Sequence, residues 1–270
     1  MQTESTQPRF FPPVSRYISK LVVLCCGLCL VSFSVRTTSG GERPRKRDRP
    51  PQKRRVFKKR FDPVVKEIEG WRVFVEPALL EGAWAEEGKR ALTMLANHLQ
   101  RIKILMLPDR LKKLQRIGIW IEHRHPRLGA MQYHPSKDWL VSHGYDPRLA
   151  KKVHITRAAE LLSRRQMLKH PAVVLHELAH AYHDQFLGFD NPEIIAAYRK
   201  AKAAGIYENV LIWTGRHGRH YGLTNPQEYF AEGTEAYLYR NDFYPFVRAE
   251  LQEHDPTLHK LLEKIWGPAR

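Results

Sequence analysis

The hydrophobic pattern in the first half of the chain predicts several strands and one long helix. Apolar and polar residues alternate in WRVFVEPALL (residues 71–80) up to a proline. Alternation and β-branched residues also mark IGIWIE (117–122) and VHIT (153–156), as is typical of strands. Residues 83–107 instead carry apolar side chains at helical spacing and end just before a second proline.

The second half of the chain predicts a helix with clear start and stop residues. Pro171 suits the first turn of a helix, and Gly188 suits the position after its last turn. The stretch between them, AVVLHELAHAYHDQFL (172–187), is long enough for about four turns. Its residues are mostly apolar, so we expect this helix to be buried.

Four more segments follow this helix. We expect a helix from Asn191 to Gly205, and a hairpin within 208–224 that turns near two glycines. Asn225 followed by proline marks the start of a third helix, PQEYFAEGTEAYLYR. The last thirty residues predict two helices, broken where a proline follows Asp255. With the strands of the first half, these helices predict an α+β fold.

The strong positive charge belongs to one segment rather than to the whole chain. The formal net charge of the 270 residues is +17. Residues 36–60 hold twelve Lys and Arg against two acidic residues, a net of +10, and residues 1–35 add +2, which leaves +5 for 61–270. A segment this rich in Pro and Arg cannot bury a core, so we interpret 36–60 as a disordered linker. It contains only one aromatic residue, Phe57, so nucleic-acid binding through stacking is the less favoured interpretation.

An apolar run precedes the basic segment. Residues 21–35 contain no charged side chain and follow Lys20. Fifteen residues are few for a membrane span and suit the core of a signal peptide. All three cysteines lie in this run, so its removal would leave no cysteine in the mature chain. We expect a secreted or cell-envelope protein whose catalytic domain spans 61–270, with an uncleaved membrane anchor within 1–35 as the alternative.

The candidate chemistry lies in HELAH, on the first predicted helix of the second half. His176 and His180 are four residues apart, so they lie on one face and can offer two imidazoles to one metal ion. Glu177 is rotated by about 100° from His176, beside the ion, where it can take a proton from metal-bound water. Buried polar groups of this kind need a partner, and one Zn²⁺ ion is the simplest.

A third ligand is expected on the helix that starts at Asn225. Glu228, Glu232 and Glu235 fall at positions i, i+4 and i+7, on one face. Glu228 can bind the metal, and Glu232 can accept the N–H of a ligand histidine. We expect Glu235 to be a solvated or structural residue. An exposed acidic helix face, with no metal, would produce the same spacing.

The motif pair resembles a known family. HELAH followed by YGLTNPQEYFAE (221–232) is similar to the gluzincin metallopeptidases, and to the catalytic domain of anthrax lethal factor and its relatives. The resemblance covers roughly residues 171–188 and 221–237. It implies a zincin-like domain in which the motif helix packs on a small mixed sheet. Residues 219 and 220 depart from the family pattern, so the substrate is left open.

The resemblance also implies roles for individual residues. The implied zinc ligands are His176, His180 and Glu228. Glu177 would be the general base, and Tyr221 the hydrogen-bond donor to the transition state. Glu232 would again be the partner of a ligand histidine. His217 and His220 are alternative proton donors when the residues alone are considered.

We therefore expect a zinc-dependent metallopeptidase that hydrolyses peptide bonds of a peptide or protein substrate through zinc-bound water activated by Glu177. The substrate is expected to lie along an edge strand formed by 117–122 or 153–156, with Tyr133, His134 and Trp139 lining the cleft. Two alternatives remain open. The chain could be a zinc-stabilised structural module at the cell envelope with no turnover, or its basic segment could bind nucleic acid.

Overall fold

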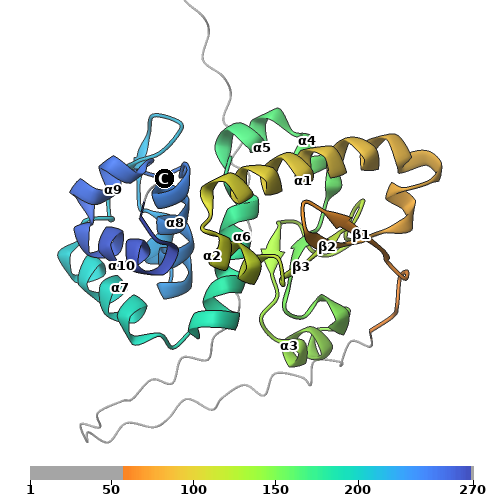
Figure 1. The fold of residues 1–270 in the computed structure, drawn as a ribbon, viewed down its shortest axis with the longest axis horizontal. Coiled ribbons are helices and arrows are strands. Elements are labelled where there is room, and N and C mark those ends of the chain that lie inside the picture. The colour runs from red at the N-terminus through yellow and green to blue at the C-terminus, as the bar shows by residue number, and fades with distance from the viewer. Residues whose placement is uncertain (1–56, 269–270) are drawn as a thin grey trace, which may run out of the picture. The chain divides into compact units, whose positions relative to one another are not determined.

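The computed structural model describes residues 57–268. The predictions for residues 1–35, and those for residues 36–56 of the basic segment, lie outside this range. Within it, a small mixed sheet carries the helices α1 and α6 on one face and the short helix α3 on the other, and the helices α7 to α10 gather apart from the sheet (Figure 1). The prediction of an α+β fold is confirmed.

The sheet has five strands in the order β1-β2-β3-β5-β4. These are β1 (Val64–Ile68), β2 (Trp71–Val75), β3 (Gly118–Ile121), β5 (Lys152–Ile155) and β4 (Gln132–Tyr133). Strands β2, β3 and β5 run parallel, and β1 and β4 pair antiparallel at the two edges. The expectation that β3 or β5 forms the edge strand is therefore wrong. Alternation along a strand shows which residues share a face, but it does not show which strand is the outermost one.

The two faces of the sheet carry different residues. Ile119 and Ile121 of β3, like Val153 and Ile155 of β5, belong to the main core, which also contains the buried faces of the long helix α1 and the motif helix α6. Trp120 lies on the opposite face, in a smaller apolar cluster with Leu128, Leu140, Tyr145 and Leu149. Because side chains alternate along a strand, successive residues of β3 belong to two different apolar clusters, one on each face of the sheet.

The helices are α1 (Ala85–Leu105), α2 (Pro108–Leu114), α3 (Lys137–Ser142), α4 (Ala158–Leu162), α5 (Arg164–Lys169), α6 (Val173–Tyr182), α7 (Pro192–Ala204), α8 (Pro226–Leu238), α9 (Arg248–His254) and α10 (Pro256–Trp266). Of these, α1, α6, α7, α8, α9 and α10 lie within the predicted helical segments, whereas α2 was not predicted. Short 3₁₀ helices cover Pro77–Leu79, Gly82–Trp84, Pro147–Leu149 and Tyr221–Leu223, and a π-helical turn at His183–Leu187 extends α6. The predicted hairpin is formed by β6 (Val210–Leu211) and β7 (His217–Gly218). Among residues 57–268, no helix is both long enough and apolar enough to cross a membrane.

Side-chain caps fix where three of these helices begin. Asn191 accepts hydrogen bonds from the first-turn N–H groups of α7, Asn225 from the N–H of Glu228 in α8, and Asp255 from the N–H of Leu258 in α10. Each cap is followed by proline at the first helical position, which has no N–H to satisfy. These local signals made the helix starts predictable.

Helix α8 lies at the centre of the helical part. Every residue from Tyr229 to Leu238 is buried. It packs against α6 on one side and against α9 and α10 on another. Gly233 permits the contact with α10, because a Cβ at this position would lie 2.6 Å from a Leu258 methyl carbon. The acidic residues of α8 are therefore carried into the protein interior and do not form an exposed face.

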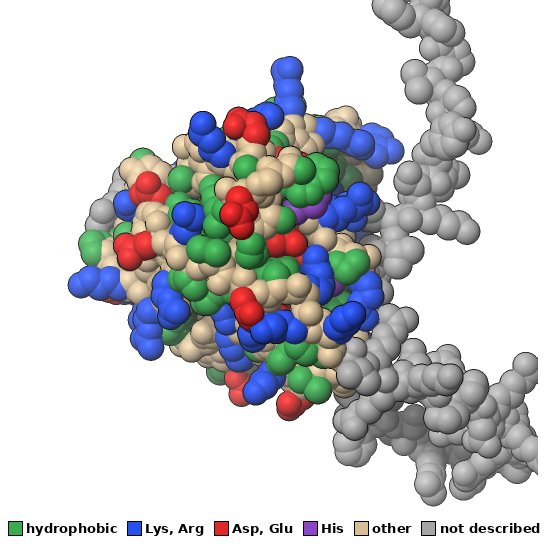
Figure 2. Space-filling model, turned by 90° about the vertical axis from the view of Figure 1, so that its right-hand side faces the viewer, with side chains coloured by type: hydrophobic (Ala, Val, Ile, Leu, Met, Phe, Trp, Pro, Cys, Tyr) green, Lys and Arg blue, Asp and Glu red, His purple; other side chains and the backbone are tan. Residues whose placement is uncertain are grey.

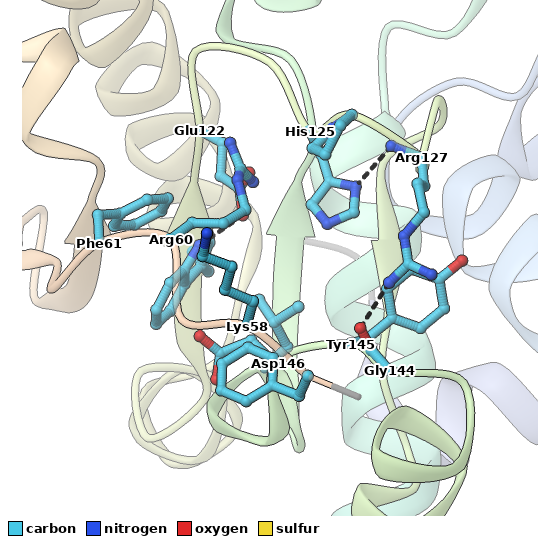
Figure 3. A pocket seen from close by; sticks show the side chains of 13 residues that line it. Lys58, Arg60, Phe61, Glu122, His125, Arg127, Gly144, Tyr145 and Asp146 are labelled. Atoms are coloured by element: carbon cyan, nitrogen blue, oxygen red, sulfur yellow. Dashed lines mark hydrogen bonds and ion pairs between the residues drawn. The ribbon is translucent and has the colours of Figure 1, made fainter. Parts of the chain in front are cut away.

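The outer face of the sheet holds a pocket of about 230 Å³ (Figure 3). Arg60 forms part of its wall and donates hydrogen bonds to the Glu122 carboxylate and to the Arg124 carbonyl. Phe61 packs against Trp120 with the ring centroids 5.6 Å apart. Residues 57–60, which the sequence assigned to the linker, thus include one that is bonded to the sheet.

Candidate metal centre

Helices α6 and α8 bring three donor atoms together. His176 Nε2 and His180 Nε2 lie 3.0 Å apart on adjacent turns of α6. Glu228 Oε2, in the first turn of α8, lies 3.2 Å from both nitrogens. Its backbone N–H is held by Asn225, so the cap that starts α8 also fixes the position of the carboxylate. These are the three residues that the sequence assigned as metal ligands.

The spacing of the three atoms fits one metal ion. Zinc binds imidazole and carboxylate at about 2.0–2.1 Å, so two ligands of a tetrahedral ion lie about 3.3 Å apart. The separations of 3.0 and 3.2 Å between His176, His180 and Glu228 are close to that value. The donor set of two imidazoles and one carboxylate therefore fits a divalent metal ion in both kind and distance.

The electrostatics of the cluster favour a positive charge at its centre. Burial opposes ionisation of Glu228, but the charges of and hydrogen bonds with His180 and His176 hold the pKa of its carboxyl well below the usual range. Burial likewise opposes protonation of His176, yet Glu228 and Glu235 raise its pKa well above the ordinary value. These carboxylates therefore favour a positive charge at this place, which a metal cation would supply.

Glu177 lies beside the cluster and is not one of its corners. The carboxylate is buried, and its Oε2 accepts a hydrogen bond of 2.8 Å from the backbone N–H of Tyr133. Burial raises the pKa of this carboxyl, and the charges of His176 and His180 offset part of the effect. A buried carboxylate with a raised pKa is suited to receive a proton near neutral pH.

The predicted cleft residues are divided between the two sides of the sheet. Tyr133, in the edge strand β4, touches Glu177 through its backbone N–H. His134 instead bonds to His154 at 3.1 Å, and Trp139 packs with the aromatic cluster around Trp120. The prediction that all three line the cleft is therefore wrong for His134 and Trp139. Strand β4 is only two residues long, so the sequence shows no alternation from which the side-chain directions in this region could be predicted.

Glu232 and Glu235 occupy places that differ from the expected ones. Glu232 Oε1 is 3.7 Å from His176 Nδ1, beyond hydrogen-bond distance, whereas Glu235 Oε1 lies 2.6 Å from the same nitrogen. Glu235 is fully buried, so of the two expected roles, solvated or structural, the solvated one is excluded. Its Oε1 also lies 2.8 Å from His170 Nε2. The i, i+7 spacing could have suggested Glu235, but nothing in the sequence singled out His170.

Tyr221 and His220 lie close to the cluster in different ways. Tyr221 is 38 % exposed, and its hydroxyl lies 3.5 Å from Glu228 Oε1, a long distance for a hydrogen bond. His220 is buried, and its Nδ1 accepts the N–H of Gly222 at 2.9 Å. Burial lowers the pKa of His220 to about 3. A neutral, buried imidazole is a poor proton donor, and His217 is exposed in strand β7 of the hairpin. Of the candidate donors, Tyr221 has the contact with the cluster.

Comparisons with known proteins give a limited result. Neither a family model nor a curated protein sequence matches this chain. Among solved structures, the chain is similar to the Pro-Pro endopeptidase PPEP-2 from Paenibacillus alvei, at 20 % identity and a TM-score of 0.38, over 64 % of this chain and 89 % of that one. Because this likeness is low, the function of this chain has to follow from its own residues.

Proposed function

We propose that the protein is a zinc-dependent metallopeptidase of the gluzincin type, acting on a peptide or protein substrate. The observation that carries this proposal is the convergence of His176, His180 and Glu228 within 3.0–3.2 Å, from two helices far apart in the sequence. Two imidazoles and one carboxylate are a ligand set of catalytic zinc sites, which keep a further position open. When bound, the ion would polarise a carbonyl oxygen and lower the pKa of a water molecule.

Glu177 would act as the general base. The Tyr133 N–H holds one of its oxygens, so the carboxylate keeps a fixed orientation next to the ligand nitrogens. The carboxylate would take a proton from the attacking water and pass it to the leaving amine. The raised pKa of its carboxyl makes the first step easier, because a more basic carboxylate accepts a proton more readily.

Tyr221 would stabilise the negative charge that develops on the substrate oxygen. Its hydroxyl lies near the Glu228 carboxylate, and its side chain is partly exposed and within reach of a substrate. A phenol donor at this place would strengthen its hydrogen bond as the carbonyl oxygen becomes an anion. Glu228, for its part, would hold the ion and would not exchange protons.

Export remains part of the proposal and rests on the apolar run at 21–35 alone. The nucleic-acid alternative concerns the basic segment, of which residues 36–56 lie outside the described residues, so it stays an alternative. In the view of Figure 2, Lys and Arg side chains are interspersed with acidic and apolar ones and form no continuous patch on that face.

The test is cleavage of a peptide library by the full chain, with and without added Zn²⁺, for the wild type and for Glu177→Gln. We expect the variant to keep its metal and to lose at least about 100-fold in hydrolysis, the usual contribution of a general base. Glu253→Gln, an exposed acidic residue on α9, is the matched control and should cleave normally. Unchanged cleavage by Glu177→Gln would remove this residue from the mechanism. A wild type that binds one ion but cleaves no peptide would favour the structural module.

A further inference from the structure

His176 has two ring nitrogens, and only Nε2 faces the metal cluster. Its Nδ1 points to the opposite side, where it meets Glu235 at 2.6 Å. We propose that Glu235, anchored by His170, is the residue that positions His176 for metal binding. This inference rests on the proposed metal site. It assigns the positioning role to Glu235, which lies about one turn after Glu232, the residue that the family resemblance implies.

The contacts describe a short buried chain of hydrogen bonds. His176 donates from Nδ1 to Glu235 Oε1, and His170 donates from Nε2 to the same oxygen at 2.8 Å. Placing the proton of His176 on Nδ1 leaves the lone pair of Nε2 directed toward His180 and Glu228. The bond also fixes the ring plane, because an imidazole held at one nitrogen cannot rotate about χ2 without breaking it. Glu235 thus sets both the tautomer and the orientation of a ligand.

His170 gives the arrangement its rigidity. It directly follows α5 and lies outside α6, and its Nε2 reaches Glu235 of α8. Its ring meets that of His176 edge-on, with the centroids 5.3 Å apart. A single carboxylate oxygen that accepts two N–H donors from different parts of the chain has little freedom to move. The Glu235 side chain is also completely buried, so water does not compete for these bonds.

Glu232 is the competing candidate, because it lies one turn after Glu228. Its Oε1 is 3.7 Å from His176 Nδ1. Among the described residues, the Oε2 atoms of Glu232 and Glu235 both have no hydrogen-bond partner, so only the Oε1 distances separate the two candidates. The distance from His176 to Glu235 is shorter by more than 1 Å. Since hydrogen bonds between N–H and carboxylate weaken beyond about 3.2 Å, the contact with Glu235 is the effective one.

A second metal ion between His170, His176 and Glu235 is the other alternative, since their donor atoms lie within 4.8 Å of one another. The distances decide against it. Ligand atoms that share a zinc ion lie about 3.3 Å apart, and the 3.0–3.2 Å separations in the cluster with Glu228 are close to this value. Glu235 Oε1 lies only 2.6 and 2.8 Å from its two nitrogens, which are hydrogen-bond lengths that leave no room for an ion between them.

The experiment compares two matched variants of the full chain, Glu235→Gln and Glu232→Gln. Zn²⁺ affinity would be measured by competition with a chelating dye, and the number of ions bound by metal analysis. We expect Glu235→Gln to weaken binding by about 10- to 100-fold, the usual effect of losing the partner of a ligand histidine. Glu232→Gln should weaken it less than about 3-fold on the same argument. Equal affinity of Glu235→Gln and wild type, or a larger loss in Glu232→Gln, would overturn the assignment, as would two ions per chain.

A second variant guards against loss of the fold. His170→Gln alters a less buried side chain and should weaken Zn²⁺ binding less than Glu235→Gln does. The visible absorption of bound Co²⁺ should change in both variants, because the ligand ring is no longer held in place. A purely structural role would lower the melting temperature of the metal-free chain and leave the Co²⁺ spectrum unchanged. If the wild type itself binds no ion, the proposed function fails. If the wild type binds one ion and the variants bind it equally well, only the positioning role of Glu235 fails.

Discussion

Two buried clusters of histidine and glutamate lie on opposite sides of the sheet, and they differ in geometry rather than in composition. On the helical side, His176, His180 and Glu228 form a compact triangle of donor atoms. On the outer face, His134, His154 and Glu122 form a line of hydrogen bonds, with distances of 3.1 and 3.2 Å. The first arrangement directs three donors at one point, whereas the second passes hydrogen bonds from one group to the next.

The line on the outer face is satisfied by the protein itself. Glu122 also accepts hydrogen bonds from Trp120 Nε1 and from the Arg60 guanidinium, so both of its oxygens are occupied. His125, nearby, accepts two backbone N–H groups at its Nδ1. Buried polar groups that already have partners gain nothing from a metal ion. The comparison shows that the kinds of residue do not identify a metal site, because the donor atoms must also share a centre.

The sharpest way to break this comparison is to remove one histidine from each cluster. His180→Ala should abolish stoichiometric Zn²⁺ binding, since it deletes one of three protein ligands. His154→Ala should leave the metal affinity unchanged and destabilise the fold by about 1–3 kcal/mol, because it leaves buried partners unsatisfied. Metal analysis and denaturant unfolding of the two full-length variants measure both effects. Loss of metal binding in a folded His154→Ala protein would mean that the outer cluster takes part in the site.

An effect on stability alone, without loss of metal binding, is expected from the ion pair that joins Arg60 to the outer cluster. Arg60→Met leaves the buried Glu122 carboxylate without its charged partner. Breaking a buried pair costs about 3–5 kcal/mol, but Arg60 is 35 % exposed, so we expect about 1–3 kcal/mol. Lys58→Met, which changes another exposed basic residue in the segment before β1, is the control and should change stability little. If the two variants unfold at the same denaturant concentration, residues 57–60 belong with the linker after all.

The smallest expected effect is a dependence of the unfolding free energy on pH. Burial lowers the pKa of His125 to about 4 and that of His154 to about 3, below the unfolded value of about 6.5. Between these values the unfolded chain binds more protons than the folded one, so stability should fall as the pH decreases from about 6.5 to about 4. His125→Asn should flatten this dependence in unfolding measurements on the metal-free protein. An equally steep dependence in the variant would assign the effect to other buried histidines, such as His183.

Much of the helical part could be predicted from local signals. Asn191, Asn225 and Asp255 each precede a proline, and each accepts backbone hydrogen bonds in the first turn of a helix. These caps act within four residues, so the sequence alone reveals them. The positions of β3 and β5 inside the sheet were not predictable in this way. Strand order depends on pairing between segments far apart in the chain, and alternation carries no information about it.

The sequence by itself determined that His176, Glu177 and His180 share a helix, because the residue spacing and the helical period are both local properties. It also determined that three glutamates follow on one face of a later helix. Only the tertiary structure decided which glutamate meets which nitrogen. The packing of α6 against α8 sets Glu228 at 3.2 Å from both ligand nitrogens and Glu235 at 2.6 Å from His176 Nδ1. Contacts between helices depend on how buried side chains fill space across the whole domain, and residue spacing within one helix does not encode them.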